Sequence, residues 1–356
     1  MPAYNVLMMG ASYGSLLAMK LLFGGHKITL VCLPAEIEAF NKDGAHVRMP
    51  IRGRKDPIDL DSRKLPGSLR AAAPGDVNPK DYDLVVLAMQ EPQYRSAGVR
   101  ELLDGVARAK VPCMSIMNFP PLPYLKRIKG LNPDPLRVCF TDATVWDNFE
   151  PGLVTLCSPD PQAIRPPGEK INFLLVTLPT NFKSARFESA AATQILRNLE
   201  KDVEAARYDA GDGPIELPVK LKVHESIFVP LAKWAMLLAG NYRCVTADSA
   251  IDIKDAVHAD LAASRSVYNW VVEVCTKLGA DPADLVPFEK YADAANGLVR
   301  PSSAARALNN GVTNIERTDR LVQLLGAQLG MHNPLVDKIV AQVDARLDAN
   351  RKKAAA

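Results

Sequence analysis

The sequence of 356 residues predicts an α/β protein, in which a doubly wound parallel sheet is followed by an all-helical domain. Three features of the chain support this prediction. An apolar strand, a glycine-containing turn, an apolar helix and a second strand follow one another within residues 4–31. Strand-like and helix-like segments then alternate up to residue 118, as in a parallel sheet with helical crossovers. From residue 229 onward, apolar residues recur at helical spacing.

The chain is too long for one small core, which favours two domains. We expect residues 1–225 to form the first domain and residues 226–350 the helical one, with a disordered tail at 351–356. The net charge of +3 argues against a nucleic acid as partner. The apolar runs are too short to span a membrane, and six scattered cysteines are typical of buried thiols in a reducing compartment. We therefore expect a cytoplasmic protein without a membrane or nucleic-acid partner.

The first 31 residues match the opening of a dinucleotide-binding βαβ unit. Val6–Met9 is an apolar strand, Ser15–Leu22 an apolar helix and Ile28–Val31 a second strand. The turn between the first strand and the helix consists of Gly10, Ala11, Ser12, Tyr13 and Gly14. In such a turn glycines let the backbone approach a pyrophosphate, and the helix N-terminus offers free N–H groups to its charge. These five residues are therefore the first candidates for cofactor binding.

The spacing of the glycines leaves other interpretations open. The full fingerprint has glycines at its first, third and sixth positions, whereas this turn has Ser12 in the middle and is one residue short. Its glycines could instead serve only tight packing. The turn also spells Gly-x-Ser-x-Gly, the nucleophile elbow of α/β hydrolases, with His224, His258 and His332 downstream. That elbow normally follows several strands, so a serine hydrolase is a weaker hypothesis. A metal enzyme is also weak, because the histidines lack ligand spacing.

Two further strands of the predicted sheet end in polar side chains. The apolar run Asp83–Met89 leads to Gln90, and Val111–Met117 leads to Asn118. Ligands of doubly wound sheets lie beyond the C-terminal ends of the strands, so both residues are site candidates. Beyond them, residues 135–225 contain mostly strand-like segments, with one helix from about 184 to 199.

The helical domain opens with an apolar segment that carries one charge. Lys233 is the only charged residue between positions 227 and 241, and Asn241 closes the segment. Desolvation penalises an ammonium group, so Lys233 needs a polar cavity or a partner, unless it extends its charged end to solvent at the rim of the helix. Helical periodicity places Asn241 close to the same face.

The order of these parts resembles the ketopantoate reductase family over nearly the whole chain. The similar strings are residues 14–18, 25–31, 83–88 and 301–303, together with the helix of Lys233 and Asn241. The resemblance implies a Rossmann-like N-terminal domain and a helical domain like the C-terminal domain of 6-phosphogluconate dehydrogenase. It also implies hydride transfer between NADPH and the 2-oxo carbon of a small acid, in a homodimer.

The resemblance assigns roles to individual residues. The family's catalytic lysine matches Lys233, which would protonate or polarise the developing alkoxide. Two family asparagines match Asn118 and Asn241, and the family's substrate-contacting serine matches Ser302 or Ser303.

The chain departs from the family at three positions near the expected substrate. A family lysine is Gln90 here, a second helix asparagine is Leu237, and a glutamate falls on Asn314. Glu316, two positions after Asn314, would point about 200° around a helix and so does not replace that glutamate. The site keeps fewer charges and gains an apolar wall. We therefore expect a substrate that is larger or less polar than ketopantoate.

The position that selects the cofactor is also altered. The family's arginine for the 2′-phosphate of NADPH is Leu33 here, and neither an acid for NAD nor a base for NADP replaces it at that position. Glu36 could reach a ribose, and Arg48, Arg52 or Arg54 could reach a phosphate. We expect NADP, with NAD as the alternative.

These observations predict an NAD(P)-dependent oxidoreductase that transfers hydride between the nicotinamide and the carbonyl or alcohol carbon of a 2-oxo or 2-hydroxy acid or a related compound other than ketopantoate. Lys233 would be the acid–base group, and Asn118, Asn241 and Ser302 would orient the substrate. A second hypothesis stays open: a paralogue that binds a nucleotide or metabolite without redox turnover, as the shortened turn and the lost glutamate suggest.

Overall fold

The computed structural model describes residues 3–211 and 213–355, and within them the chain divides into two units. Unit 1 runs to Met89 and also contains Gln93–Tyr124 and Val145–Glu225; unit 2 contains Gln90–Pro92, Leu125–Thr144 and the chain from Ser226 onward. Gln90–Pro92 and Leu125–Thr144 thus belong to unit 2 although both precede residue 226.

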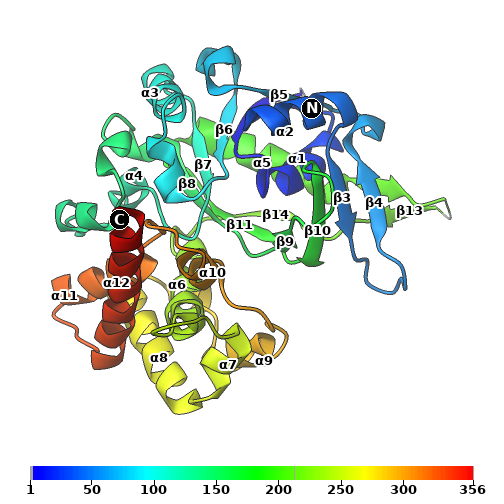
Figure 1. Ribbon diagram of the computed structural model, residues 1–356. Helices are drawn as coiled ribbons and strands as arrows, with labels where there is room; N and C mark the ends of the chain where they lie inside the picture. The colour runs from blue at the N-terminus through cyan, green and yellow to red at the C-terminus, as the bar shows by residue number, and fades with distance from the viewer. Residues whose placement is uncertain (1–2, 212, 356) are drawn as a thin grey trace. The chain divides into compact units, whose positions relative to one another are not determined.

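Within the described residues, unit 1 is built on an eight-stranded sheet with the order β14-β11-β8-β7-β6-β1-β2-β5 (Figure 1). Its strands are β1 (Asn5–Met9), β2 (Lys27–Val31), β5 (Ser68–Ala72), β6 (Leu84–Leu87), β7 (Cys113–Ile116), β8 (Val154–Ser158), β11 (Phe182–Ala185) and β14 (Leu221–His224). Across the sheet, the neighbouring strands β8, β7, β6, β1, β2 and β5 are parallel to one another, and β11 runs antiparallel to β8. Every residue of β6 is fully buried, as expected for an inner strand of a parallel sheet.

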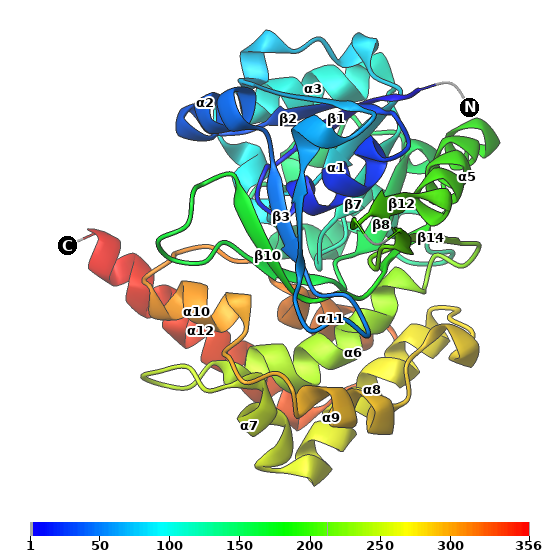
Figure 2. The same ribbon diagram turned by 90° about the vertical axis from the view of Figure 1, so that its right-hand side faces the viewer.

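The helices of unit 1 are α1 (Gly14–Leu22), α2 (Pro34–Asp43), α3 (Val99–Ala109) and α5 (Ala190–Ala205), and the short α4 (Leu122–Leu125) ends one of its segments. Helix α1 packs on β1, β2 and β5 and also contacts α5, which covers β14 (Figure 2). In the sheet, Met9 pairs with Val31 on one side and with Leu87 on the other. The strand order therefore reverses at β1, and the crevice that binds ligands in such sheets lies at its carboxyl end.

A second, four-stranded sheet in unit 1 has the order β4-β3-β10-β9. Its strands are β3 (His46–Met49), β4 (Ile58–Asp61), β9 (Gln162–Ile164) and β10 (Phe173–Leu178), and a separate hairpin joins β12 (Arg207–Asp209) to β13 (Pro214–Glu216). The parallel pairing of β10 with β3 brings residues 173–175 beside residues 46–48. Segments far apart in the sequence are thus neighbours in this sheet.

The helices of unit 2 are α6 (Lys233–Met236), α7 (Ile253–His258), α8 (Leu261–Lys277), α9 (Phe288–Ala295), α10 (Ser303–Asn309), α11 (Thr318–Gln328) and α12 (Pro334–Ala355). The apolar face of α8 is internal, because Val267, Val271 and Val274 are at most 1% exposed. In the part of the chain that the structure describes, no helix combines the length and the apolar character needed to cross a bilayer.

Two elements differ from the sequence-based expectations. The helix expected at about 184–199 is α5, Ala190–Ala205, because residues 182–185 form β11 and the Ser189 hydroxyl caps the helix by accepting from the Ala192 amide. The tail expected to be disordered from residue 351 continues α12 as far as Ala355, where alanine and lysine favour a helix. Ala356, the last residue of that expected tail, lies outside the described residues.

Candidate active site

The two glycines of the first turn are required by close packing. Gly10 has a φ of +109°, and a Cβ on it would lie 2.7 Å from the Ala88 carbonyl oxygen. A Cβ on Gly14 would lie 2.7 Å from the Met8 sulfur. These are the tight-turn and helix-packing roles of the outer glycines in a dinucleotide-binding turn. Packing therefore explains both glycines without excluding a phosphate.

The middle of the turn is arranged around Ser12 and Tyr13. Ser12 is exposed at the tip, and its carbonyl accepts a hydrogen bond of 2.9 Å from the Ser15 hydroxyl. The Tyr13 hydroxyl donates to the Pro161 carbonyl, and its ring packs edge-on against Phe182 at 5.8 Å. Burial raises the pKa of Tyr13, so the phenol stays neutral. Tyr13 thus anchors the turn to the chain after β8, while Ala11 is buried beneath it.

The carboxyl edge of the sheet in unit 1 fits a dinucleotide. Helix α1 begins at Gly14, and the first amides of an α-helix point outward at its N-terminus without α-helical acceptors; here the Leu16 amide already donates to the Tyr13 carbonyl at 3.2 Å. Asn118 follows β7 at the same edge, half-buried, and its Oδ1 is buried without a hydrogen-bond partner. A buried acceptor of this kind is often completed by a ligand. Leu33 lies just beyond β2 and is 68% exposed, so an apolar surface is open there. Gln90, the remaining cofactor candidate, is exposed and belongs to unit 2.

The segment of Lys233 and Asn241 is not the regular helix that the sequence predicts. Helix α6 spans only Lys233–Met236, and a π-helical turn, Leu237–Asn241, follows it. The wider turn changes the angular spacing of the side chains, so α-helical periodicity no longer relates the two residues. Both are nevertheless accessible: from residue 231 to residue 242, only Lys233, Met236 and Asn241 are not buried.

Side-chain donors hold the π-helical turn in place. The Tyr291 hydroxyl donates to the Met236 carbonyl at 3.0 Å, and the Ser302 hydroxyl donates to the Asn241 carbonyl at 2.7 Å. These bonds satisfy carbonyls at the two ends of the widened turn. Single π-helical turns are frequent at functional sites.

The structure separates the two serine candidates. Ser302 is 2% exposed and caps α10, because its hydroxyl also accepts from the Ala305 amide at 3.1 Å. Ser303 is exposed in the first turn of the same helix. Ser302 therefore acts as an anchor for Asn241, and Ser303 has the accessible hydroxyl. Whether either residue binds substrate stays a prediction.

The carboxyl group of Glu316 interacts electrostatically with Lys233, whose charge lowers the pKa of that group. The objection that Glu316 points around a helix is wrong, because α10 ends at Asn309 and α11 begins at Thr318. Removal of water from its carboxyl group raises the pKa of Glu316 to about 8, the charge of Glu91 acts in the same direction, and the charge of Lys233 opposes both.

Two neighbours, Tyr242 and Glu91, fix the position of Glu316. The Tyr242 hydroxyl donates to its carbonyl at 2.5 Å, and the Glu91 amide donates to its Oε1 at 3.4 Å. Glu91 itself is 2% exposed, and its carboxylate accepts from the Thr141 amide at 3.0 Å and from the Thr141 hydroxyl at 2.8 Å. The sequence indicated neither carboxylate as part of a site, because the contact between Glu91 and Glu316 joins positions 225 residues apart.

Asn314 lines a different part of unit 2. It borders a cavity of about 410 Å³ whose lining includes Arg317, Arg320 and Asp344 but not Lys233 or Asn241. Arg317 binds Asp319 through two bonds of 3.0 and 2.9 Å and contacts Asp344 at 2.7 Å. Acidic partners thus neutralise its charge. The cavity does not bring Asn314 together with the lysine.

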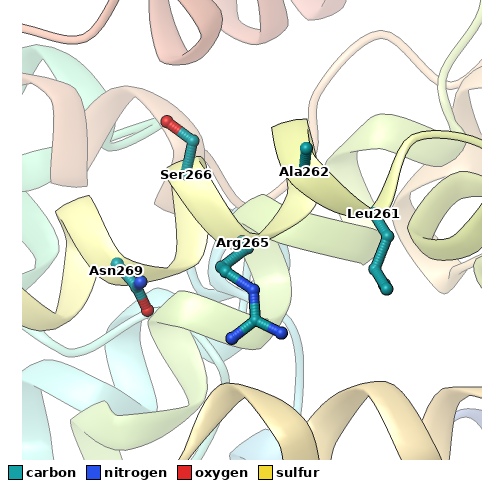
Figure 3. A pocket seen from close by; sticks show the side chains of 5 residues that line it. All are labelled: Leu261, Ala262, Arg265, Ser266 and Asn269. Carbon is teal, nitrogen blue, oxygen red and sulfur yellow. The ribbon is translucent and has the colours of Figure 1, made fainter.

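A second hollow, of about 540 Å³, lies on one face of α8 (Figure 3). Its lining residues are Leu261, Ala262, Arg265, Ser266 and Asn269. None of them is a site candidate. Arg265 is paired with Glu289 and covers the Phe288 ring at 4.5 Å. This surface therefore contributes nothing to the candidate site.

Comparisons with known proteins bear on the fold. The sequence matches no model of a protein family and no curated protein sequence. Solved structures do match: 2-dehydropantoate 2-reductase from Methylococcus capsulatus superposes with a TM-score of 0.66 at 14% identity, covering 97% of each chain. The fold is that of the ketopantoate reductases.

Two further structures with this fold extend the comparison. A dimeric ketopantoate reductase from Staphylococcus aureus has a TM-score of 0.61 at 11% identity, covering 97% of this chain and 99% of its own. D-Mandelate dehydrogenase, solved with NADH and anilino(oxo)acetate, has a TM-score of 0.63 at 11% identity, covering 98% and 99%. Proteins with this fold thus include both a ketopantoate reductase and a D-mandelate dehydrogenase.

Proposed function

We propose that this protein is an NAD(P)-dependent oxidoreductase, a divergent member of the ketopantoate reductase family, which interconverts a 2-oxo acid and a 2-hydroxy acid. One observation carries the proposal: in a chain with this fold, Lys233 is the one charged residue of an apolar helical segment, is accessible, and interacts with the carboxyl group of Glu316. Such a lysine is suited to proton transfer.

The residues of unit 1 support binding of the nicotinamide cofactor. The N-terminus of α1 would receive the pyrophosphate, and Gly10 and Gly14 keep the turn close to the sheet. The unpartnered Oδ1 of Asn118 would accept a hydrogen bond from a ligand at the edge of the sheet. When bound, the nicotinamide would supply or accept a hydride at the substrate carbon. We expect NADP rather than NAD.

The residues of unit 2 would act on the substrate oxygen. The ammonium group of Lys233 would donate a proton to the alkoxide that forms during reduction and would take it back during oxidation. Asn241 would orient the substrate, and Ser303 offers a hydroxyl group at the first turn of α10. Glu316 would tune the charge around Lys233, because its own pKa of about 8 lies near neutrality.

We further propose that the substrate is not ketopantoate. Leu237, which replaces a family asparagine, is 3% exposed, and Asn314 faces a cavity without Lys233. With Gln90 in place of a lysine, the site has fewer charged groups for a small polar acid. A larger, less polar 2-oxo acid, with an aromatic or branched side chain, suits such a site better.

The first experiment is titration of the purified protein with NADPH and with NADH, followed by calorimetry and tryptophan fluorescence. We expect micromolar binding of at least one of them. A set of 2-oxo acids with polar, branched and aromatic side chains is then tested for the ability to oxidise whichever of NADPH and NADH binds. Absence of binding at millimolar concentration would contradict the proposal and favour a role without redox chemistry.

A Lys233→Met variant tests the role of the lysine. Loss of general acid catalysis is expected to lower kcat by about 10²–10⁴-fold without weakening nucleotide binding. Lys277→Met is a matched control, because Lys277 lies on α8 and pairs with Glu273 at 3.2 Å on the surface. Equal turnover in the Lys233→Met variant and the control would reject Lys233 as the acid–base group. Light scattering of the same samples tests the expected homodimer.

A further inference from the structure

The carboxyl end of β2 is where a Rossmann-like sheet selects between NAD and NADP. An acid there binds the ribose 2′-hydroxyl of NAD, whereas an arginine accommodates the 2′-phosphate of NADP. In this chain the exposed Leu33 occupies that position, between β2 and α2. A charge that selects between the two cofactors must therefore come from another residue.

Arg165, the residue that follows β9, reaches this place from more than 120 residues later in the sequence. Its Nη1 lies 2.5 Å from Oε1 of Glu36, and Oε2 of the same carboxylate accepts from the Leu33 amide at 2.9 Å. The guanidinium group is thus fixed beside the first turn of α2. The pair also lies near the Cys32 thiol, whose pKa is raised by burial and by the charge of Glu36 and lowered by that of Arg165.

The pair is asymmetric in a way that favours a phosphate ligand. The Glu36 side chain is 9% exposed, and each of its oxygens already accepts a hydrogen bond. The Arg165 side chain is 26% exposed, and its Nη2 is buried without a hydrogen-bond partner. An unsatisfied guanidinium donor is costly unless a ligand completes it, and a phosphate oxygen is its best acceptor.

Of the arginines suggested by the sequence, Arg48 is less suitable. Arg48 binds Asp59 through two bonds of 2.7 and 2.9 Å, and its guanidinium group lies over the Phe173 ring at 5.3 Å. Its donors are therefore directed to a carboxylate. Arg165 combines proximity to β2, a fixed orientation and a donor without a partner.

We propose that Arg165 binds the 2′-phosphate of NADP and that Glu36 positions its guanidinium group, so that the protein prefers NADP over NAD. This inference rests on the proposed function, because it presumes a dinucleotide at the carboxyl edge of the sheet. In the ketopantoate reductase family the arginine for the 2′-phosphate directly follows β2. In this chain Arg165 would take that role, and it follows β9, which pairs with β10.

The test compares ligands that differ only in the 2′-phosphate. Calorimetry on wild-type protein and on Arg165→Met would use NADPH, NADH, adenosine 2′,5′-bisphosphate and 5′-AMP. We expect Arg165→Met to weaken both 2′-phosphorylated ligands by about tenfold or more and to leave NADH and 5′-AMP unchanged. Arg165→Lys should restore part of the loss, and Arg48→Met, the matched control, should bind as the wild type does.

Glu36→Gln provides a second variant. It should lower the ratio of NADPH to NADH affinity, which a merely structural role of Glu36 would not change. Equal weakening of all four ligands by Arg165→Met, or equal affinity of the wild type for NADPH and NADH, would overturn this inference and leave the proposed function standing. If the wild type binds none of the four ligands, both the inference and the proposed function are wrong.

Discussion

The hydroxyl group of Tyr291 occupies the space that a side chain on Gly240 would need. A Cβ on Gly240 would lie 2.0 Å from that hydroxyl oxygen, and the same hydroxyl donates to the Met236 carbonyl at 3.0 Å. The glycine and the tyrosine therefore depend on each other. Together they stabilise the π-helical turn that separates Lys233 from Asn241.

A double-mutant cycle tests this dependence. Gly240→Ala alone should cost about 1–3 kcal/mol of unfolding free energy, because the methyl group overlaps the hydroxyl. Tyr291→Phe alone should cost about 0.5–1.5 kcal/mol, because it removes the hydrogen bond to the Met236 carbonyl. In the Tyr291→Phe background, Gly240→Ala should cost less, since the overlap is gone. Urea denaturation of the four proteins measures the coupling.

Tyr268→Phe is the matched control for this cycle. The Tyr268 hydroxyl also donates to a carbonyl, that of Val286 at 2.6 Å, and its ring stacks on Tyr291 at 5.5 Å. It lies outside the contact with Gly240. Gly240→Ala should therefore cost as much in the Tyr268→Phe background as in the wild type. Additive effects of Gly240→Ala and Tyr291→Phe would contradict the proposed dependence.

The carboxyl group of Glu316 should make stability fall as the pH rises. Its pKa is raised from 4.5 to about 8 in the folded protein, so between these values the folded state holds a proton that the unfolded state has lost. Relative to Glu316→Gln, the wild type should lose unfolding free energy from about pH 5 to pH 8 and stay level above that. Urea denaturation at half-unit pH steps measures the difference.

The surface acid Glu289 serves as the comparison. Arg265 lowers its pKa, so the difference between the wild type and Glu289→Gln should change only in more acidic solution, and with the opposite sign. A wild-type curve parallel to that of Glu316→Gln from pH 5 to pH 8 would show that Glu316 ionises normally.

The sequence predicts the parts of this fold that depend on local pattern. The glycine turn before α1, the apolar run of β6 and the periodicity of α8 each follow from neighbouring residues, and each lies where expected. The second sheet could not be predicted, because β3 pairs with β10 across more than 120 residues and both strands are short.

The candidate site divides in the same way. Lys233 stands out as a lone charge in an apolar run, which is visible in the sequence. The π-helical turn after it depends on Tyr291, which lies 50 residues beyond the turn, and the contact of Glu316 with Glu91 spans 225 residues. Glu316 does not follow helical periodicity, because the chain between α10 and α11 is irregular. Local periodicity carries no information on such contacts.

The two serines at the start of α10 should respond differently to replacement. Ser302→Ala removes a helix cap and the donor to the Asn241 carbonyl, so it should cost about 1–2 kcal/mol of unfolding free energy. Ser303→Ala should change stability by less than about 0.5 kcal/mol and raise KM if its hydroxyl contacts the substrate. Denaturation and steady-state kinetics with the best 2-oxo acid distinguish the two. A Ser302→Ala variant as stable as the wild type would refute the anchoring role.

The buried Lys20 of unit 1 should make stability rise with pH. Its side chain is 1% exposed, its Nζ donates to the Pro218 carbonyl at 3.1 Å, and burial lowers its pKa from 10.5 to about 7. Lys220 lowers the pKa further, while Glu216 and Glu204 oppose the shift. Between pH 7 and the ordinary lysine value, the unfolded state binds a proton that the folded state has released.

The unfolding free energy of the wild type should therefore increase relative to Lys20→Met by up to about 1.4 kcal/mol per pH unit above pH 7. The variant loses the bond to Pro218, so its absolute stability also changes, and the pH slope rather than the offset is the informative quantity. Lys277→Met, at an exposed lysine, should show the wild-type slope. If Lys20→Met and the wild type have parallel curves from pH 7 to 9.5, the ammonium group is still charged in the folded protein. It would then rely on Glu204 and Glu216 to offset its burial.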